Sequence, residues 1–422
     1  MILAYRILTN ILYPFLFIFL YLRVLLKKED PTRYKEKILV KHFNVTKTKN
    51  YELLWFHAAS VGEFKSIIPI IKDLNEKKSN IEFLITTATL SSGQLAKSEL
   101  QKFNNAYHRF MPMDVNYLIE KFLILWKPKR IFLIDSEIWP NLILKAKENN
   151  IPISLLNARL TKKSFNRWKI FSKTAEKIFR TFNLCICSNQ ETKEYLQIFK
   201  VQNVKYFGNL KLINEIDKKE LSSVNDEILS KSRFWVASSI HQEEDVFCIK
   251  THLEIKKKYP DVVLIIAPRH LNKVNKIKLI SEGYNLKTQV LNFNEKIHKE
   301  TEVIIINSFG VLQYFYKYAK SVFIGKSMVT RLKNDSGQNP LPAAYLNCKI
   351  YHGPYVSNFF EIYESLKKKD LSKKIENISE LSNFLIKDLE NIKKNENNHL
   401  KSFQSLSDEI LSKSMNQIKN FI

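Results

Sequence analysis

The segment WFHAASVGE, residues 55–63, has the residue types and the spacing of a catalytic turn. An apolar, strand-like run ends at His57, a turn of small residues follows, and a helix is predicted to start near Glu63. A carboxylate on a turn from a strand into a helix can serve as a general base. Helix capping is the competing explanation, because Ser60 suits an N-cap and Glu63 complements the helix dipole. On residue types alone, capping is the better explanation.

Two further segments of the first half carry polar residues directly after an apolar run. In IFLIDSEIWPN, residues 131–141, Asp135 and Glu137 follow a predicted strand and precede Trp-Pro-Asn. These two carboxylates either point into a cleft or only cap the next helix. In FGNLK, residues 207–211, a lone lysine, Lys211, ends the first half of the chain. Most lone lysines are solvated, so Lys211 alone indicates little.

The second half holds three segments that suit a phosphorylated ligand. In APRH, Arg269 follows a predicted buried strand and can hold a phosphate through two parallel hydrogen bonds. The segment NSFG, residues 307–310, can bring backbone N–H groups to a base or a phosphate. The segment SGQNPL predicts a helix with Asn339 as N-cap and Pro340 at the first position, and such a helix end attracts anions. Each segment also has a capping or packing explanation, and only their joint placement at strand ends favours a site.

The elements that must position these residues are two successive sets of short apolar runs that alternate with helix-like segments. Such runs are typical of parallel strands buried on both faces, and two sets indicate an α/β protein with two doubly wound domains. Ligands of such domains bind beyond the carboxyl ends of the strands. The predicted strands are 53–57, 83–87, 131–135, 153–157 and 184–187 in the first half, and 234–237, 262–267, 303–307, 322–324 and 349–352 in the second.

An uncharged apolar run, residues 7–22, lies between Arg6 and Arg23. A membrane span needs about 20 apolar residues, so this run is at the short end of the range. No small-residue cleavage site follows it, which argues against a removed signal peptide. Lys27 and Lys28 begin the cluster of cations expected on a cytoplasmic flank. An uncleaved anchor with the body of the protein in the cytoplasm is favoured over a buried N-terminal helix.

The chain of 422 residues is too long for one ordinary core, so two domains are expected. A polar stretch between the two sets of strands is the natural linker, and the C-terminal region has helical spacing without a strand signal. The predicted parts are a membrane anchor (1–26), an N-terminal Rossmann-like domain (27–211), a linker (212–230), a C-terminal Rossmann-like domain (231–360) and C-terminal surface helices (361–422).

The formal net charge of +25 suggests an anionic partner, which could be nucleic acid, a membrane surface or a phosphorylated substrate. Part of this surplus is discounted, because abundant lysine and only 8 glycines are typical of an AT-rich coding bias. A nucleic-acid partner is disfavoured, since no aromatic-rich binding motif or basic helix accompanies the charge. The 4 cysteines form no CxxC pair, so they predict no metal site.

Taken together, these segments resemble the 3-deoxy-D-manno-oct-2-ulosonic acid (Kdo) transferase family. The matching motifs are HAASVGE, DSEIWPN, LNARL, GNLK, the run WVASSIHQEE, APRH, and GQNP with the following HGP and Asn358, in family order from about residue 50 to 360. The resemblance implies a GT-B fold of two Rossmann-like domains facing a cleft, with an N-terminal membrane-anchor helix. It implies inverting transfer from CMP-Kdo to a phosphorylated lipid A precursor (lipid IVA), without a metal or another cofactor. The setting would be lipopolysaccharide biosynthesis at the cytoplasmic face of the inner membrane.

The resemblance also assigns roles to residues. Glu63 would be the general base, while Glu137 and Lys211 would support the transition state. Residues 27–211 would bind the acceptor, and residues 231–360 would bind CMP-Kdo. The donor contacts would be Pro268, Arg269, Phe309, Gly310, Val311, Asn339, Pro340 and Leu341.

The chain departs from the family pattern at three places in its second half. Gly325-Lys326 stands where the family usually has two glycines, and Gln338 stands where it has a histidine. Pro342 replaces the acidic residue that follows Asn-Pro-Leu. This last change removes the side chain expected at the ribose hydroxyls of the nucleotide.

The expected reaction needs positive charge near the departing phosphate, which Arg269, Lys211 and helix N-termini can supply without a metal ion. Glu63, on the opposite face, would take the proton of the acceptor hydroxyl. Since a helix N-terminus lowers the pKa of a carboxylate, proton transfer is expected late, after the bond to CMP has largely broken. The alternative is a non-catalytic, membrane-tethered binder of anionic lipid, which would not need the residues around Arg269 and Asn339.

Overall fold

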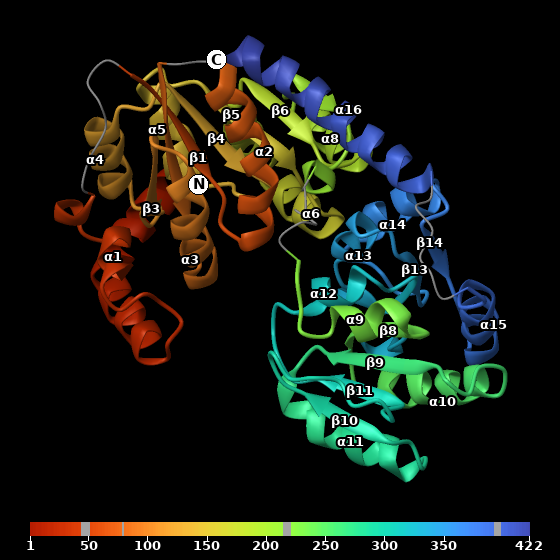
Figure 1. Cartoon of the computed structure of the whole chain (residues 1–422). Coiled ribbons are helices and arrows are strands. Elements are labelled where there is room, and N and C mark those ends of the chain that lie inside the picture. The colour runs from red at the N-terminus through yellow and green to blue at the C-terminus, as the bar shows by residue number, and fades with distance from the viewer. Residues whose placement is uncertain (44–50, 78–79, 214–220, 392–397) are drawn as a thin grey trace. The chain divides into compact units, whose positions relative to one another are not determined.

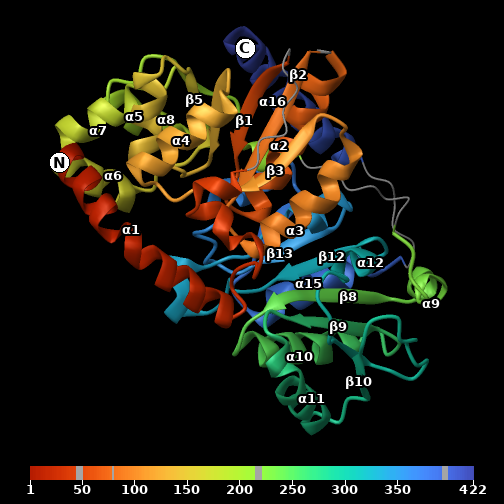
Figure 2. The same ribbon diagram turned by 90° about the vertical axis from the view of Figure 1, so that its left-hand side faces the viewer.

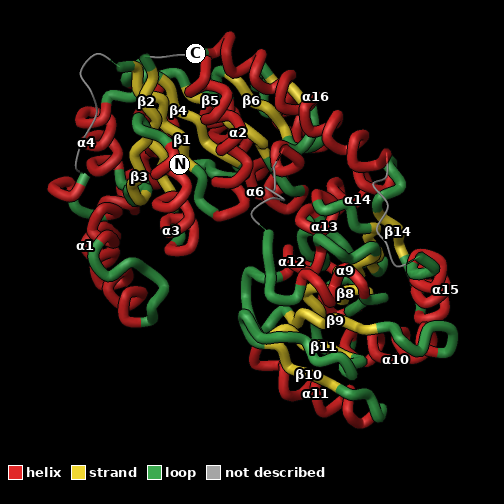
Figure 3. Tube along the Cα trace, viewed as in Figure 1, coloured by secondary structure: helices red, strands yellow, loops and turns green. Residues whose placement is uncertain are grey.

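The structure is a computed structural model that describes residues 1–43, 51–77, 80–213, 221–391 and 398–422. The chain divides into two compact units (Figure 1). Unit 1 comprises Met1–Asn214 together with Ser407–Ile422, and unit 2 comprises Glu215–Leu406. In each unit a layer of strands lies between helices (Figure 3), so the predicted pair of doubly wound α/β domains is confirmed.

The sheet of unit 1 has seven parallel strands in the order β3-β2-β1-β4-β5-β6-β7. The strand order reverses between β1 and β4, whose carboxyl ends therefore diverge into loops on opposite faces. Such a reversal is the place where doubly wound sheets bind their ligands. The strands are β1 (Glu52–His57), β2 (Ile81–Thr87), β3 (Ala106–Phe110), β4 (Arg130–Ile134), β5 (Ile153–Ala158), β6 (Leu184–Cys187) and β7 (Val204–Tyr206).

Alternate side chains of these strands bury themselves on the two faces of the sheet of unit 1. Trp55 contacts Phe122 of α4, with ring centroids 4.8 Å apart, while its neighbour Phe56 stacks on Phe132 at 4.4 Å. The second face is covered in part by the end of the chain, because Phe421 packs edge-on against Phe132. The helices are α1 (Ile2–Leu25), α2 (Val61–Lys77), α3 (Leu90–Glu99), α4 (Asn116–Trp126), α5 (Pro140–Glu148), α6 (Lys162–Ile170), α7 (Ser172–Phe179), α8 (Gln190–Ile198) and α16 (Asn398–Phe421).

Unit 2 repeats this plan with seven parallel strands in the order β10-β11-β9-β8-β12-β13-β14, and its order reverses between β8 and β12. The strands are β8 (Phe234–Ile240), β9 (Val263–Pro268), β10 (Thr288–Leu291), β11 (Val303–Ile306), β12 (Ser321–Ile324), β13 (Lys349–His352) and β14 (Ser372–Lys374). The helices are α9 (Asp226–Lys231), α10 (Glu244–Lys256), α11 (Val274–Gly283), α12 (Leu312–Tyr316), α13 (Leu341–Tyr345), α14 (Phe360–Lys367) and α15 (Ile378–Asp388).

The C-terminal region 361–422 differs from its prediction as a strand-free set of helices. It contributes the edge strand β14, whose last two residues are exposed lysines without an apolar pattern. Its final helix belongs partly to unit 1, where Arg130 Nε donates a hydrogen bond to the Phe421 carbonyl at 2.9 Å. The predicted linker 212–230 lies partly outside the described residues, and its last residues begin α9.

Candidate functional site

Glu63 lies in the first turn of α2, directly beyond the carboxyl end of β1. Its Oε2 accepts a hydrogen bond from the Ala59 N–H at 2.7 Å, and its Oε1 accepts one from the Ser60 hydroxyl at 2.8 Å. Ser60 Oγ also lies 3.4 Å from the Glu63 nitrogen, so the capping role predicted for Ser60 is present. The same contacts that cap the helix hold the Glu63 carboxylate at the β1–β4 reversal.

Glu137 follows β4 and is held from two sides. Trp139 Nε1 donates to Glu137 Oε2 at 2.7 Å, and His57 Nε2 lies 3.2 Å from the same oxygen. His57 is fully buried at the end of β1, and the Thr86 hydroxyl lies 3.0 Å from its Nδ1. The Thr86 carbonyl oxygen also lies 3.1 Å from Nδ1, so Thr86 holds one side of the ring while Nε2 faces Glu137. His57 is therefore a positioning residue for this carboxylate.

Lys211 lies in the short helix η4 (Leu210–Ile213), and its ammonium group forms an ion pair with Asp135 Oδ2. Asp135 is buried and has a φ of 63°, a left-handed conformation that Asp tolerates better than most residues. Asn157 Oδ1 accepts the Leu210 N–H at 2.8 Å and fixes η4 against the end of β5. The lysine is thus held at the same edge of the sheet as Glu63 and Glu137.

The environments of the two glutamates push their pKa values in opposite directions. Burial raises the pKa of Glu63, and the charges of Glu137 and Asp135 raise it further, although Ser60 and Ala59 hydrogen bonds oppose them. Burial alone would also raise the pKa of Glu137, but the hydrogen bond and charge of His57 and the Trp139 N–H bring it below its usual value. Burial and the neighbouring carboxylates therefore act against the lowering of the pKa that is expected from the helix N-terminus. Opposite shifts of this kind separate a proton acceptor from a group that stays ionised.

In unit 2 a buried carboxylate holds together the loops that follow β8 and β12, where the strand order reverses. Glu244, only 1% exposed, accepts four backbone N–H groups at 2.7–3.0 Å, from His241, Lys326, Ser327 and Met328. Gly325 comes so close to β8 that an added Cβ would lie 2.6 Å from the Ile240 Cα. The loop after β12 is therefore tied to the start of α10, and its glycine has no room for a side chain.

Positive charge gathers around the carboxyl ends of β8, β9 and β12. Arg269 follows Pro268 at the end of β9; its N–H donates to the Ile240 carbonyl at 3.0 Å, and its side chain is exposed. The His241 and His270 rings meet edge-to-face at 5.8 Å. Burial lowers the pKa of His241 to about 4, and the charges of Lys326, His270, Arg269 and Arg331 contribute to the shift. Neutral His241 thus stands among cations that suit a phosphate.

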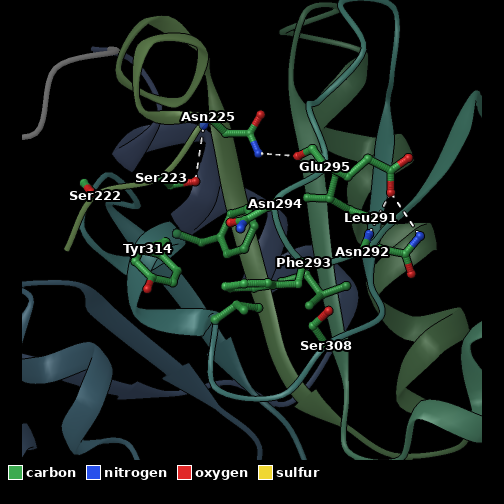
Figure 4. A pocket seen from close by; sticks show the side chains of 13 residues that line it. Ser222, Ser223, Asn225, Leu291, Asn292, Phe293, Asn294, Glu295, Ser308 and Tyr314 are labelled. Carbon is green, nitrogen blue, oxygen red and sulfur yellow. Dashed lines mark hydrogen bonds between the residues drawn. The ribbon is translucent and has the colours of Figure 1, made fainter.

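Phe309, Gly310 and Val311 follow β11, where the sequence predicts donor contacts. Phe309 is 71% exposed, Gly310 has a φ of 81°, and Val311 is buried. Beside Val311 lies a small recess of about 30 Å³, lined by the loops after β10 and β11 and by Ser222, Ser223 and Asn225 (Figure 4). This space has room for about one or two water molecules, so a nucleotide base would have to bind against the exposed Phe309 or displace the lining side chains.

Asn339 precedes α13, which begins at Leu341, one residue later than predicted, with Pro340 as its N-cap. Asn339 Oδ1 accepts the Leu341 N–H at 3.1 Å, so the expected capping contact is made. Pro342 is half-buried in the first turn. Asp335, one possible substitute for the missing acidic residue, already accepts hydrogen bonds from Lys326 Nζ at 2.9 Å and Asn358 Nδ2 at 2.7 Å.

The structure collects the sequence-predicted residues into two groups, one in each unit. Glu63, Glu137 and Lys211 meet at the β1–β4 reversal, and the predicted donor residues lie beyond β9, beyond β11 and at the start of α13. Sequence reasoning missed the role of His57, the pairing of Asp135 with Lys211, and the clamp made by Glu244. His57 and Glu244 lie within quoted motifs, but their contacts have no sequence signal. In the described part of the chain, no cluster of His, Cys, Asp and Glu has the arrangement of a metal site.

Comparison with known proteins gives consistent matches. Residues 32–214 match the family described as 3-deoxy-D-manno-octulosonic-acid transferase (kdotransferase). The chain is 32% identical over 330 residues to a probable mitochondrial 3-deoxy-D-manno-octulosonic acid transferase of Arabidopsis thaliana, covering 75% of this chain and 72% of the relative. It is 30% identical over 346 residues to a 3-deoxy-D-manno-octulosonic acid transferase of Aquifex aeolicus, covering 82% and 88%.

A solved structure of a UDP-N-acetylglucosamine 2-epimerase resembles the chain with a TM-score of 0.58 at 13% identity, covering 88% of this chain and 97% of the other. This likeness shows the fold alone. The two parallel-sheet α/β domains are those of the GT-B class, as the sequence predicts, and an apolar helix precedes them. With the matches along most of the chain, the molecule is a glycosyltransferase, and it belongs to the 3-deoxy-D-manno-octulosonic acid transferase family.

Proposed function

We propose that this transferase moves Kdo from CMP-Kdo to a phosphorylated lipid A precursor, lipid IVA, with inversion at the anomeric carbon. The reaction would serve lipopolysaccharide biosynthesis at the cytoplasmic face of the inner membrane. The observation that carries the proposal is the buried Glu63 carboxylate at the β1–β4 reversal, whose pKa is raised beside an ionised Glu137. Membership of the Kdo transferase family supports the identity of the sugar.

The proposed step is a single displacement. The acceptor hydroxyl oxygen bonds to the anomeric carbon, the bond from that carbon to the CMP phosphate oxygen breaks, and CMP leaves with the electron pair. The hydroxyl proton passes to Glu63, whose raised pKa makes it a stronger base than an exposed glutamate. Lys211, paired with Asp135, supplies positive charge on the unit 1 side.

The donor side of the proposal rests on the cations of unit 2. Arg269 would hold the phosphate, and the backbone after β11, at Phe309, Gly310 and Val311, would approach the nucleotide. His241 stays neutral at physiological pH because its pKa is lowered to about 4. It can therefore donate or accept a hydrogen bond without adding another charge.

The direct test is a turnover assay with purified protein, CMP-Kdo and detergent-dispersed lipid IVA. We expect CMP release that depends on the acceptor, a product with one more Kdo, and an inverted anomeric configuration by NMR. The second candidate, a non-catalytic binder of anionic lipid, predicts lipid binding without any CMP release. Retention of the anomeric configuration would contradict the single displacement.

A further prediction concerns Pro342, which stands where the family has an acidic residue. Pro342→Glu is expected to tighten CMP binding about ten-fold, because one charge-assisted hydrogen bond to the ribose, worth about 1.5–3 kcal/mol, becomes available. The fold should tolerate the change, since the first N–H groups of a helix have no intrahelical partner. Isothermal titration with CMP and with its 2′-deoxy analogue measures both affinity and discrimination.

Pro342→Gln is the matched control, because it has the same length and the same effect on α13 but no charge. We expect it to give a much smaller gain than Pro342→Glu. Equal affinities of the wild type and Pro342→Glu, with unchanged discrimination, would show that another group such as Glu361 already serves the ribose. That result would contradict the prediction that Pro342, in place of an acidic residue, weakens nucleotide binding.

A further inference from the structure

One face of α1 is bound to the body of unit 1 along the whole length of the helix. The Tyr5 hydroxyl donates to Asp114 Oδ2 at 2.9 Å, and Arg6 pairs with Glu148 at 2.6 Å. Further along, the Tyr13 hydroxyl donates to the Ile38 carbonyl at 2.6 Å, and Leu20 is buried. Near the other end, Arg23 pairs with Glu29 at 2.8 Å. Between these residues, Thr9 accepts a hydrogen bond from Asn141 and Leu16 packs on the core, so contacts recur every three or four positions and form a single stripe.

The opposite face of α1 is bare and apolar. Its side chains include Leu3, Ile7, Ile11, Phe15 and Ile18, each between 50% and 70% exposed. In the part of the chain that the structure describes, α1 alone is long and apolar enough to cross a membrane. Exposed apolar patches of this extent mark a lipid or protein contact. The ribbon of α1 runs along the outside of unit 1 (Figure 2), and the helix has one docked face and one exposed apolar face, called here the naked face.

The contacts at both ends of α1 are incompatible with a helix that crosses a bilayer. Arg6 and Arg23 are separated by about 26 Å along the axis, close to the thickness of a hydrocarbon core. Crossing would carry Tyr5 and Arg6 to the far side, away from Asp114 and Glu148. It would leave the buried Asp114 without one of its donors. A helix lying in the membrane interface keeps every contact and buries the naked face in lipid.

A second exposed apolar feature lies where α6 meets α7. Ile170 is 73% exposed and Phe171 is 48% exposed, although both follow the partly buried Trp168. We name residues 162–173 the elbow. Its exposed cations are Lys162, Lys163, Arg167, Lys169 and Lys173. Exposed apolar side chains surrounded by lysine and arginine are typical of protein surfaces that bind the interface of an anionic membrane.

The elbow and the start of α1 are neighbours on the same side of unit 1. Arg6 of α1 contacts Glu148, the last residue of α5. The residue before it, Lys147, lines a groove of about 440 Å³ with Lys173, Lys177 and Arg180 of the elbow and α7. The end of α5 therefore joins the two features, and the groove between them carries mostly positive charge.

We propose that unit 1 rests on an anionic lipid surface through two adjacent contacts: the naked face of α1 lies in the interface, and the elbow inserts Ile170 and Phe171. A lipid occupant is favoured over a protein, because the apolar side chains lie on a helix of membrane-like composition and the surrounding groups are cations. This inference needs no assumption about the reaction, since it rests on the contacts of unit 1 alone.

The elbow is tested by the binding of full-length protein to vesicles of phosphatidylcholine mixed with phosphatidylglycerol. Ile170→Ser combined with Lys173→Glu should lower the partition coefficient about ten-fold or more, because an apolar contact and a cation are both lost. Leu279→Ser combined with Lys276→Glu is the control, since Leu279 is 71% exposed and Lys276 is exposed on α11 of unit 2. Equal binding of the two variants would exclude the elbow as a lipid contact.

The position of α1 is tested with a peptide epitope at the N-terminus and inside-out vesicles of the inner membrane, whose cytoplasmic face is outermost. An α1 that lies in the interface leaves the epitope open to added protease. An α1 that spans the bilayer places the epitope in the lumen, protected, and that result overturns the arrangement. Both tests are independent of the proposed reaction, and turnover of detergent-dispersed acceptor should be unchanged in the elbow variant.

Discussion

Replacing Glu63 by alanine is expected to lower kcat by about 10²–10⁴-fold, the usual contribution of a positioned general base. The Glu63 carboxylate is buried at the β1–β4 reversal and hydrogen-bonded by Ala59 and Ser60, so its geometry is fixed before the acceptor arrives. CMP binding should be unchanged, because the proposed nucleotide contacts belong to unit 2. Turnover with CMP-Kdo, measured beside isothermal titration with CMP, separates the two effects.

Two controls make the Glu63 result specific. Glu63→Gln keeps the size and the hydrogen bond from Ala59 but cannot take a proton, so it should be nearly as inactive as the alanine variant. Glu76→Ala, an exposed glutamate in the last turns of the same helix, should be as active as the wild type. Near-normal turnover of Glu63→Gln would remove Glu63 from the role of base.

The pH dependence of kcat follows from the direction of the Glu63 pKa. Burial and the charges of Glu137 and Asp135 raise this pKa, and only the deprotonated carboxylate can accept the proton. Activity should therefore fall as the pH is lowered through a value above the usual glutamate range. His57→Leu is expected to move this acidic limb to lower pH, because it withdraws the donor that keeps Glu137 ionised, and a protonated Glu137 no longer raises the pKa of Glu63. A profile identical to that of the wild type would limit His57 to a structural role.

Replacing Lys211 by alanine is expected to lower kcat/KM by about 10²–10³-fold, as the loss of one preorganised charge does in other enzymes. It should also cost stability, because it leaves the Asp135 carboxylate buried without its cation. The side chain of Asp135 is 8% exposed and that of Lys211 is 26% exposed. Since the pair is partly solvated, a loss of about 1–3 kcal/mol is expected, below that of a fully buried pair.

The double variant Lys211→Ala with Asp135→Asn separates the two effects of losing Lys211. Asparagine is neutral and tolerates the left-handed φ of this position, so it removes the uncompensated charge without straining the backbone. Thermal or denaturant unfolding should show stability regained, while turnover remains low. If turnover recovers together with stability, Lys211 acts only by holding Asp135 and η4 in place. Asp135→Asn alone shows how much activity depends on the ion pair.

The agreement between the predicted and observed strands has a local cause. The predicted runs 184–187 and 349–352 coincide with β6 and β13, and central strands such as β4 and β11 lie within a residue of their predicted bounds. Central strands of a doubly wound sheet are buried on both faces, so each is a continuous apolar run that the sequence displays directly. The edge strands β3, β7, β10 and β14 are absent from the prediction, because their partly buried or exposed residues break that run.

The sequence by itself therefore determined the α/β architecture, the family and the residue types at the strand ends. Each of these can be recognised from short stretches of consecutive residues. Only the tertiary structure decided the chemistry of those residues. Asp135 and Lys211 are 76 positions apart, and His57 and Glu137 are 80 positions apart, so no local sequence pattern predicts either contact. The raised pKa of Glu63 likewise depends on burial and on the charges of Glu137 and Asp135, which lie in the loop after β4. The same holds for α1, whose composition suits a membrane span, whereas its contacts with Asp114 and Glu148 bind it along the surface of unit 1.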